Sequence, residues 1–592
     1  MLQMWLAITQ GDPGKIRRPD PGVSGPALIA YDGPLGPAHV LLALYPETLA
    51  ARSLVRHDAH LEVRIGKCHA ALPLPDACDD DDPRLTLDAT GGRLELTLPV
   101  TATMQLFATG TGKSLYVSTD PRWLYDPTMQ LDPRGLYALL QFGTLVPPYS
   151  CWREIRRLQP GHRATLHFDP PLLKERPAPC WQPPASAETP PPTPEEQEDL
   201  VAEVLDACLR RLSPDCRPVV LFSGGVDSSL LAARAAALGW NDTLLANYSM
   251  GPDDHEGKLA RKIAAHLGLP FRSLTDDPDA WDQPLERLAR DYPQPLGDYS
   301  LVPTWRLARR VQAEAGTRCC VLDGTGADAI FRTFPKLARW QRLYRLPRPA
   351  RLVASGLYAP LDGWLHDSRA GRRLGAARTS LQLPFLLGSM ISENPLAGIA
   401  YDFPGRLRRE VHAAITAGIA ACFALPGEAM DSRGLDLRHV VCDLTGQKDA
   451  PLFLGQPLDI AYPFLVPPIV RLGLQEAIRW PGADESKAVL KRLLARHLPA
   501  EWIYRPKRGF TPPIARGLRA PGPQAALHEV VLAASNPLRP FLKMRTISRM
   551  VAGTAAGRPL PHTTYNFIWT LLATSLWLDQ FGRQPPVARA HE

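Results

Sequence analysis

The sequence predicts an α/β protein with two parts, an antiparallel β-sandwich followed by a parallel sheet that is flanked by helices. Residues 1–170 contain short β-type runs separated by Gly, Pro and Asp clusters. In residues 199–592 the first segments alternate between strand and helix patterns, which is typical of a parallel sheet, and helix patterns dominate beyond about residue 335. The stretch between them, residues 171–198, is dense in proline and is interpreted as a semi-rigid linker.

The first part is predicted to be rich in strands because its apolar and β-branched residues come in short runs. A short helix is expected at residues 136–141, ending near Gly143, where the chain needs a turn. The expected strands are residues 40–44, 61–65, 94–98, 114–118 and 163–168.

The second part opens on a pattern that predicts a phosphate-binding loop. The apolar run 218–222 indicates a buried strand, and residues 230–238 indicate a helix that Gly239 would terminate. Between them lies a tight Ser/Gly turn at a helix N-terminus, where backbone N–H groups lack intrahelical partners and attract anions. Glycines let oxyanions approach the backbone, and hydroxyls add donors. The turn supplies Ser223, Gly224, Gly225, Asp227, Ser228 and Ser229.

Asp227 is unexpected in an anion site unless a cation lies between it and the phosphates, and Mg²⁺ is the ordinary bridge. The turn lacks the G-x-x-x-x-G-K-[ST] pattern, and S-G-G-x-D-S-S instead resembles the pyrophosphate loop of ATP pyrophosphatases. The alternative is an ordinary Ser/Gly turn without a ligand.

Two later stretches are candidates for the same site. The apolar run 318–322 predicts a strand that leads into Asp323-Gly-Thr-Gly-Ala-Asp328, so Asp227 and Asp328 would share Mg²⁺ if the two strands are neighbours. Residues 485–498 predict an amphipathic helix, and a basic loop with Lys507 follows it. Lys507 would stabilise charge as pyrophosphate leaves. The alternatives are an unremarkable Gly/Asp turn and a solvated basic turn.

Composition excludes several classes of protein. The net charge of +7 over 592 residues suits an anionic nucleotide and does not by itself indicate nucleic acid. Ten scattered cysteines without a C-x-x-C pair make zinc and disulfide frameworks unlikely, so a cytoplasmic protein with reduced thiols is expected. The N-terminus has no signal-peptide pattern, and the apolar stretch 565–581 is too short and polar to span a bilayer.

Together these motifs resemble the asparagine synthetase B family, and they occur in family order. The residues that carry the resemblance are Tyr116-Val-Ser-Thr-Asp-Pro121, the loop at 223–229, residues 324–331, Tyr462-Pro-Phe-Leu465 and Arg505-Pro-Lys-Arg-Gly-Phe510. The resemblance implies a glutaminase-like (Ntn-type) domain at 1–170 and an ATP-dependent synthetase domain at 199–592. It also implies ATP and Mg²⁺ as cofactors, with Leu221, Ser249 and Gly324 among the nucleotide contacts.

The departures from the family pattern point to a particular branch. Glutamine-dependent members need a cysteine after Met1, but here the second residue is Leu2, so glutaminase activity should be absent. Branches with this loss resemble β-lactam synthetases and lasso-peptide macrolactam synthetases. Thr325 stands where relatives carry Glu or Tyr, which argues against β-lactam formation because threonine has no suitable pKa and leaves the general base unassigned.

The resemblance therefore favours a lasso-peptide macrolactam synthetase, in which a precursor peptide's Asp or Glu side chain is adenylated and its N-terminal amine then closes the ring. It implies a leader-binding protein and a leader peptidase as partners, and no nucleic acid. A β-lactam-type or other small-molecule amide synthetase and a non-catalytic scaffold remain as alternatives.

Overall fold

The computed structural model describes most of the chain. The described residues are 3–10, 16, 27–35, 37–45, 54–57, 60–64, 83–168, 171–177, 193–210, 216–249, 251, 254–275, 281–315, 319–331, 394, 396–422, 436–449, 459–474, 487–505 and 512–582. Leu2 and Lys507 lie outside these ranges.

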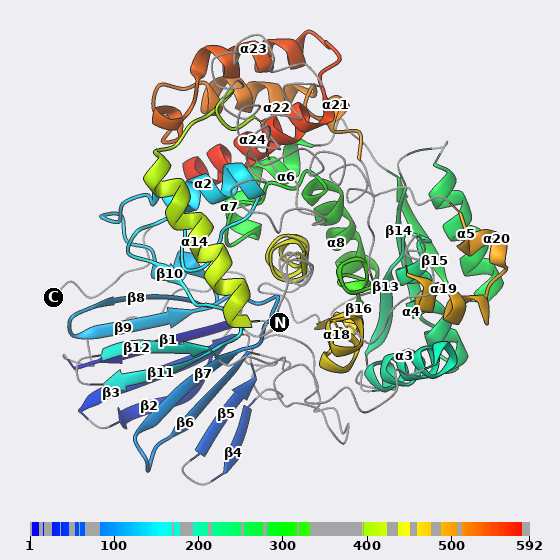
Figure 1. Cartoon of the computed structure of the whole chain (residues 1–592), viewed down its shortest axis with the longest axis horizontal. Helices are drawn as coiled ribbons and strands as arrows, with labels where there is room; N and C mark the ends of the chain where they lie inside the picture. Colours follow the sequence, from blue (N-terminus) through cyan, green and yellow to red (C-terminus); the bar gives the residue numbers. More distant parts are fainter. Residues whose placement is uncertain are drawn as a thin grey trace, which may run out of the picture.

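The first part of the chain forms two six-stranded sheets whose paired strands are all antiparallel (Figure 1). The first has the order β10-β8-β9-β1-β3-β2, with bounds Arg156–Arg157, Phe107–Thr111, Ser114–Ser118, Gln3–Thr9, Ala38–Tyr45 and Leu28–Leu35. The second has the order β12-β11-β7-β6-β5-β4, with bounds Pro171–Pro177, His162–Phe168, Arg93–Leu98, Arg84–Asp88, His60–Arg64 and Leu54–His57. All five expected strands are present in this part, although the assignment to the glutaminase class stays a prediction.

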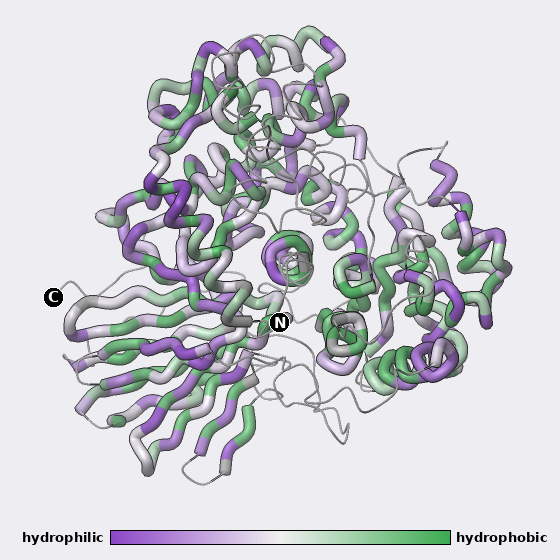
Figure 2. The backbone as a smooth tube through the Cα atoms, in the orientation of Figure 1, coloured by the Kyte–Doolittle hydropathy of each residue, from purple (hydrophilic) through white to green (hydrophobic). Residues whose placement is uncertain are grey.

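Alternation of buried and solvent-facing residues explains why these segments are strands. In β6 and β7 every second side chain is buried, so each strand gives one face to the core. Figure 2 shows hydrophobic and hydrophilic residues alternating along these strands. Leu6 and Leu42 from one sheet and Leu85 and Leu96 from the other are fully buried in one hydrophobic cluster. Burial of these side chains therefore holds the first part together.

The predicted linker at residues 171–198 differs from the structure at both ends. Residues 171–177 form β12, which pairs with β11, and helix α3 (Pro194–Arg210) begins inside the range. The linker interpretation was wrong here because it relied on the proline content. β12 begins and ends with proline, but it is an edge strand of its sheet, where missing N–H donors are tolerated.

The second part contains a five-stranded parallel sheet with the order β15-β14-β13-β16-β17. Its strands are Phe271–Thr275, Leu244–Ser249, Arg217–Leu221, Cys319–Leu322 and Asp459–Ala461 in that order. The chain builds outward from β13 through β14 to β15 and then returns to add β16 on the other side of β13. The expected α/β fold of this part is confirmed, and β13 and β16 flank the point where the strand order reverses, the usual ligand-binding position.

Helices cover both faces of the parallel sheet, and further helices complete the molecule (Figure 1). Helix α4 (Val226–Ala237) packs against α3 and against α19 (Ala488–Ala495), whereas α8 (Leu301–Ala315) contacts β13 and β14. The other α-helices of the described residues are α2 Pro133–Phe142, α5 His255–Leu267, α6 Asp282–Glu286, α7 Leu288–Asp291, α9 Ala327–Ile330, α14 Gly405–Cys422, α16 Gly446–Lys448, α18 Pro467–Leu474, α20 Ala500–Ile503, α21 Ile514–Gly517, α22 Pro521–Ala526, α23 Met544–Ala555 and α24 His562–Gly582.

Helix α24 is buried along most of its length. The ring of Trp577 lies 4.7 Å from that of Phe581, and its indole N–H donates to the carbonyl of Tyr292 (3.0 Å). Phe581 in turn packs on Trp152 from the first part of the chain, with ring centroids 4.7 Å apart. Among the described residues, no helix has the length and hydropathy needed to cross a membrane.

A buried charge cluster joins the two parts. Asp443, in the π-helical segment η7 (Asp436–Thr445), accepts hydrogen bonds from Arg157 of the first part and from Arg438, and Nδ1 of His439 lies 3.0 Å from its other carboxylate oxygen. Asp443 is fully buried. Burial alone would raise its pKa, but Arg157 and Arg438 together hold that pKa well below its usual range. The carboxylate is therefore ionised and neutralises buried cations from both parts.

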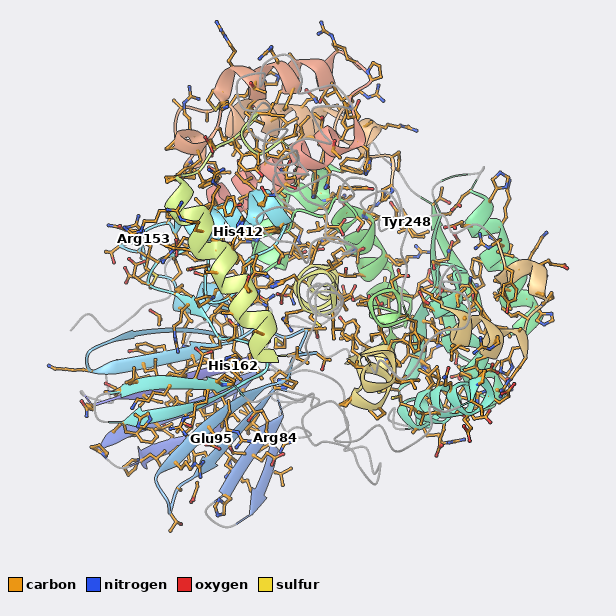
Figure 3. All side chains as sticks on the ribbon, viewed as in Figure 1. Arg84, Glu95, Arg153, His162, Tyr248 and His412 are labelled. Carbon is orange, nitrogen blue, oxygen red and sulfur yellow. The ribbon has the colours of Figure 1, made fainter. Side chains whose placement is uncertain are left out.

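The buried side chain of His412 on α14 should make the free energy of unfolding depend on pH (Figure 3). Its Nε2 lies 2.8 Å from the hydroxyl of Tyr137 in α2, and burial, with a smaller effect of Arg408, lowers its pKa to about 4. In the unfolded chain the pKa of histidine is about 6.5, so the unfolded state binds more protons than the folded state between about pH 4 and pH 6.5. The folded state therefore has its full stability with respect to this group above about pH 6.5. It loses up to about 1.4 kcal/mol of that stability per pH unit as the pH falls toward 4.

Urea unfolding at about pH 7.5 and pH 5 tests this prediction. His412→Gln should weaken the pH dependence of the free energy of unfolding, whereas the exposed His528→Gln should leave it unchanged. Equal pH dependence in wild type and His412→Gln would contradict it.

Candidate nucleotide site

The predicted phosphate loop lies between β13 and α4, and its backbone is held by its own serines. The Ser223 N–H donates to Oγ of Ser228 (3.2 Å), and the Gly225 N–H donates to Oγ of Ser223 (3.2 Å). Gly225 is the N-cap of α4 and provides no side-chain cap, so the first-turn N–H groups of the helix keep their capacity for an anion. The hydroxyl of Ser229 is buried and makes no hydrogen bond to a described residue.

The helix starts four residues earlier than residues 230–238 predict. Val226 is its first residue, so Asp227, Ser228 and Ser229 occupy the first helical turn instead of the preceding loop. The prediction placed the helix start at the first residue of the apolar run, because the preceding serine and aspartate residues are usually interpreted as turn residues. The consequence is that the side chains of the predicted site have helical spacing.

Gly224 is required by backbone geometry. Its φ is +72°, in the left-handed region that favours glycine, and a Cβ atom there would lie 3.0 Å from Cα of Ala260 in α5. Gly224→Ala should therefore lower the free energy of unfolding by about 1–3 kcal/mol and displace the loop from α5. ATP–pyrophosphate exchange should fall with it.

Gly239→Ala is the matched control for this substitution. Gly239 also has a positive φ, +81°, but a Cβ atom there meets nothing within 4 Å. Thermal unfolding should show a cost of about 1 kcal/mol with unchanged exchange activity. Equal effects of the two substitutions on ATP–pyrophosphate exchange would contradict the inference that Gly224 allows the loop to pack closely against α5.

The parallel pairing of β13 with β16 brings Asp227 and Asp328 to the same edge of the sheet. Gly324 follows β16, and a Cβ atom there would lie 3.1 Å from Cβ of Asp227. Lys487 joins the two carboxylates, because its Nζ donates to Oδ2 of Asp227 and lies 2.6 Å from Oδ1 of Asp328. Burial alone would lower the pKa of Lys487, but both aspartates raise it, so the lysine is a cation.

The donor set fits Mg²⁺. Two carboxylates that share one cation are hard oxygen ligands, and Mg²⁺ in nucleotide sites is usually bound by one or two carboxylates together with phosphates. No cluster of three or more His, Cys, Asp or Glu side chains suited to a metal occurs within the described ranges. A magnesium ion here would therefore depend on the nucleotide for its remaining ligands.

Some of the other predicted site residues lie near the phosphate loop, and one lies outside the described residues. Arg505, from the basic loop, donates to the carbonyl of Gly224 (3.3 Å) and lies 3.5 Å from Glu256 of α5, so this segment reaches the phosphate loop. Leu221 ends β13, and Ser249 ends β14, where its hydroxyl donates to the carbonyl of Gly251 (3.1 Å). Lys507 lies outside the described residues, so its role stays a prediction.

Lys487 and the buried carboxyl group of Asp449 are two features near the site that the sequence patterns did not indicate. Asp449 accepts a hydrogen bond from the hydroxyl of Tyr462 (3.0 Å), and burial, then the nearby Asp323, raise its pKa well above the usual range. Asp323 also accepts the Thr325 N–H (2.6 Å). No local pattern signals these contacts, because Asp449 and Asp323 are far apart in the sequence.

Fold and site define the class of the protein. A parallel sheet with a glycine–serine loop, an uncapped helix N-terminus and paired aspartates at the reversal of strand order is a nucleotide-binding α/β architecture. The Asparagine synthase family model matches residues 200–579, and the chain belongs to this family. Membership implies an ATP-dependent amide ligase.

Curated relatives agree with this family. Proteins of Mycobacterium tuberculosis (strain ATCC 25618 / H37Rv) and Mycobacterium bovis (strain ATCC BAA-935 / AF2122/97), both named "Putative asparagine synthetase (glutamine-hydrolyzing)", are 24% identical to this chain over 526 residues. Each match covers 82% of this chain and 74% of the relative. "Asparagine synthetase (glutamine-hydrolyzing) 1" of Bacillus subtilis (strain 168) is 24% identical over 263 residues, covering 43% of this chain and 37% of the relative.

Proposed function

We propose that this protein closes a macrolactam ring in a lasso-peptide precursor, using ATP to activate a side-chain carboxylate. Support for amide ligation comes from the family and from the loop at 223–229 beside Asp227 and Asp328. An amine that the peptide itself provides is part of this proposal, because Leu2, the residue after Met1, has no side-chain nucleophile that could hydrolyse glutamine. The observation that carries the proposal is the phosphate loop paired with two aspartates.

The reaction has two steps. A carboxylate oxygen of the peptide attacks the α-phosphorus of ATP, which forms an acyl adenylate and releases pyrophosphate. The N-terminal amine then attacks the acyl carbon, loses a proton and releases AMP. Because both groups belong to one peptide, holding them together supplies a high effective concentration.

The residues of this chain have separate roles in these steps. The first-turn N–H groups of α4 and the hydroxyls of Ser223 and Ser228 bind the pyrophosphate. Asp227 and Asp328 would hold Mg²⁺, which would neutralise phosphate charge when bound. Lys507 stabilises charge that develops during transfer. A leader-binding protein and a leader peptidase would supply the free peptide amine.

Incubation with Mg·ATP and a leaderless core peptide tests the proposal. The expected product is lighter by one water, with AMP and pyrophosphate released and no glutamate formed from added glutamine. Lys507→Ala should abolish product without unfolding the protein. Release of ADP, or asparagine formed from aspartate and ammonia, would overturn the macrolactam assignment, and retained turnover would remove Lys507 from the mechanism.

A further inference from the structure

Lys487 is placed between the two aspartates by an unusual backbone conformation. Only 4% of its surface is exposed, although lysine is rarely buried without a partner. Its φ is +60°, and it is the one non-glycine residue with positive φ in the described part of the chain. Such conformations persist where the surroundings over-determine them and are common at functional sites.

Contacts on both sides fix Lys487 in this position. Its N–H donates to the carbonyl of Phe331, directly after α9 (3.2 Å), and its carbonyl accepts the Lys491 N–H (2.9 Å) in the first turn of α19. Helix α19 is itself tied to α3, where Arg492 donates to Glu198 (2.7 Å). The lysine therefore connects α19, the Asp328 turn and the first turn of α4.

We propose that Lys487 is an internal cation that stands in for magnesium in the nucleotide-free protein and must yield its place between Asp227 and Asp328 when Mg·ATP binds. This inference rests on the proposed use of Mg·ATP. Two carboxylates that face each other repel unless a cation lies between them, and Nζ of Lys487 contacts both. A second cation between the same oxygens is repelled by the ammonium, so metal without nucleotide is disfavoured.

The arrival of nucleotide changes this balance. Phosphate oxygens add negative charge beside the carboxylates, so the site can hold both Mg²⁺ and the lysine, with the ammonium turned toward phosphate. The lysine is thus a positioning residue that keeps the aspartates together and makes metal binding depend on nucleotide. A purely structural lysine would stabilise the fold without affecting metal affinity.

Magnesium titration of the nucleotide-free protein tests the inference. Lys487→Met should bind Mg²⁺ alone at least about tenfold more tightly than wild type, measured by calorimetry and by the magnesium-dependent rise of the melting temperature. Lys491→Met is the matched control, since Lys491 lies one turn further along α19 over the ring of Tyr504, and it should resemble wild type. Unchanged or weaker magnesium binding by folded Lys487→Met would overturn the inference.

A second variant keeps the test decisive if Lys487→Met does not fold. Lys487→Arg retains the charge in a larger planar group that cannot yield its place as easily, so Mg·ATP should bind at least about tenfold more weakly than to wild type. Equal or tighter binding would overturn the inference. Wild type that binds no Mg·ATP and shows no ATP–pyrophosphate exchange would instead count against the proposed function, while the magnesium-only comparison still decides the role of Lys487.

Discussion

Asp443→Asn is expected to lower the free energy of unfolding by about 3–5 kcal/mol, because it leaves buried guanidinium groups without their counter-charge. The carboxylate of Asp443 is fully buried and accepts from Arg157 and Arg438, which lie in different parts of the chain. Asparagine preserves the shape of the side chain, so the loss reports on charge and not on packing. An effect of this size can unfold a marginally stable protein.

Urea unfolding measures this loss, and the exposed pair Arg406–Glu410 provides the control. Arg406 is 87% exposed at its side chain, so Arg406→Ala should change the free energy of unfolding by no more than about 0.5 kcal/mol. A cost below about 1 kcal/mol for Asp443→Asn would mean that solvent or other groups neutralise the arginines.

Asp227→Asn is expected to reduce ATP–pyrophosphate exchange by about 100-fold or more while the protein stays folded. The amide removes one of the two charges that would hold magnesium on the nucleotide, and each tenfold loss corresponds to about 1.4 kcal/mol of transition-state stabilisation. Folding should persist because Lys487 keeps its contact with Asp328 at 2.6 Å.

Exchange of labelled pyrophosphate into ATP measures this step without a need for the amide product. Asp199→Asn is the control, because Asp199 is 69% exposed at its side chain and pairs with Arg496 on the surface. Exchange by Asp227→Asn within about threefold of wild type would exclude Asp227 as a metal ligand.

Local patterns were sufficient for much of the fold. The apolar run before the loop at 223–229 became β13, and the apolar run at 318–322 became β16, which starts one residue later than expected. β12 was missed because a strand is defined by its neighbour, and the proline-rich sequence of residues 171–177 gives no sign that β11 pairs with it. Strand pairing is a long-range property that local composition does not encode.

The site was predictable where its residues belong to short strand–turn motifs. The loop at 223–229 and the pair Asp227 and Asp328 follow from two strand–turn patterns that parallel pairing brings together. Lys487 lies 260 residues from Asp227, and its sequence pattern is that of an ordinary amphipathic helix start. Its left-handed backbone and the two ion pairs arise only when α19 packs on α4. Tertiary contacts of this kind leave no periodic signal.

The position of helix α24 has a consequence for how the chain matures. Its residues lie near the end of the described sequence, yet they fill space between α7 and aromatic rings that are translated hundreds of residues earlier, such as Trp152 (Figure 1). During synthesis on the ribosome, the apolar surface around Trp152 therefore stays exposed until helix α24 has been translated. Nascent chains that stall before residue 562 should be substrates for chaperones and proteases.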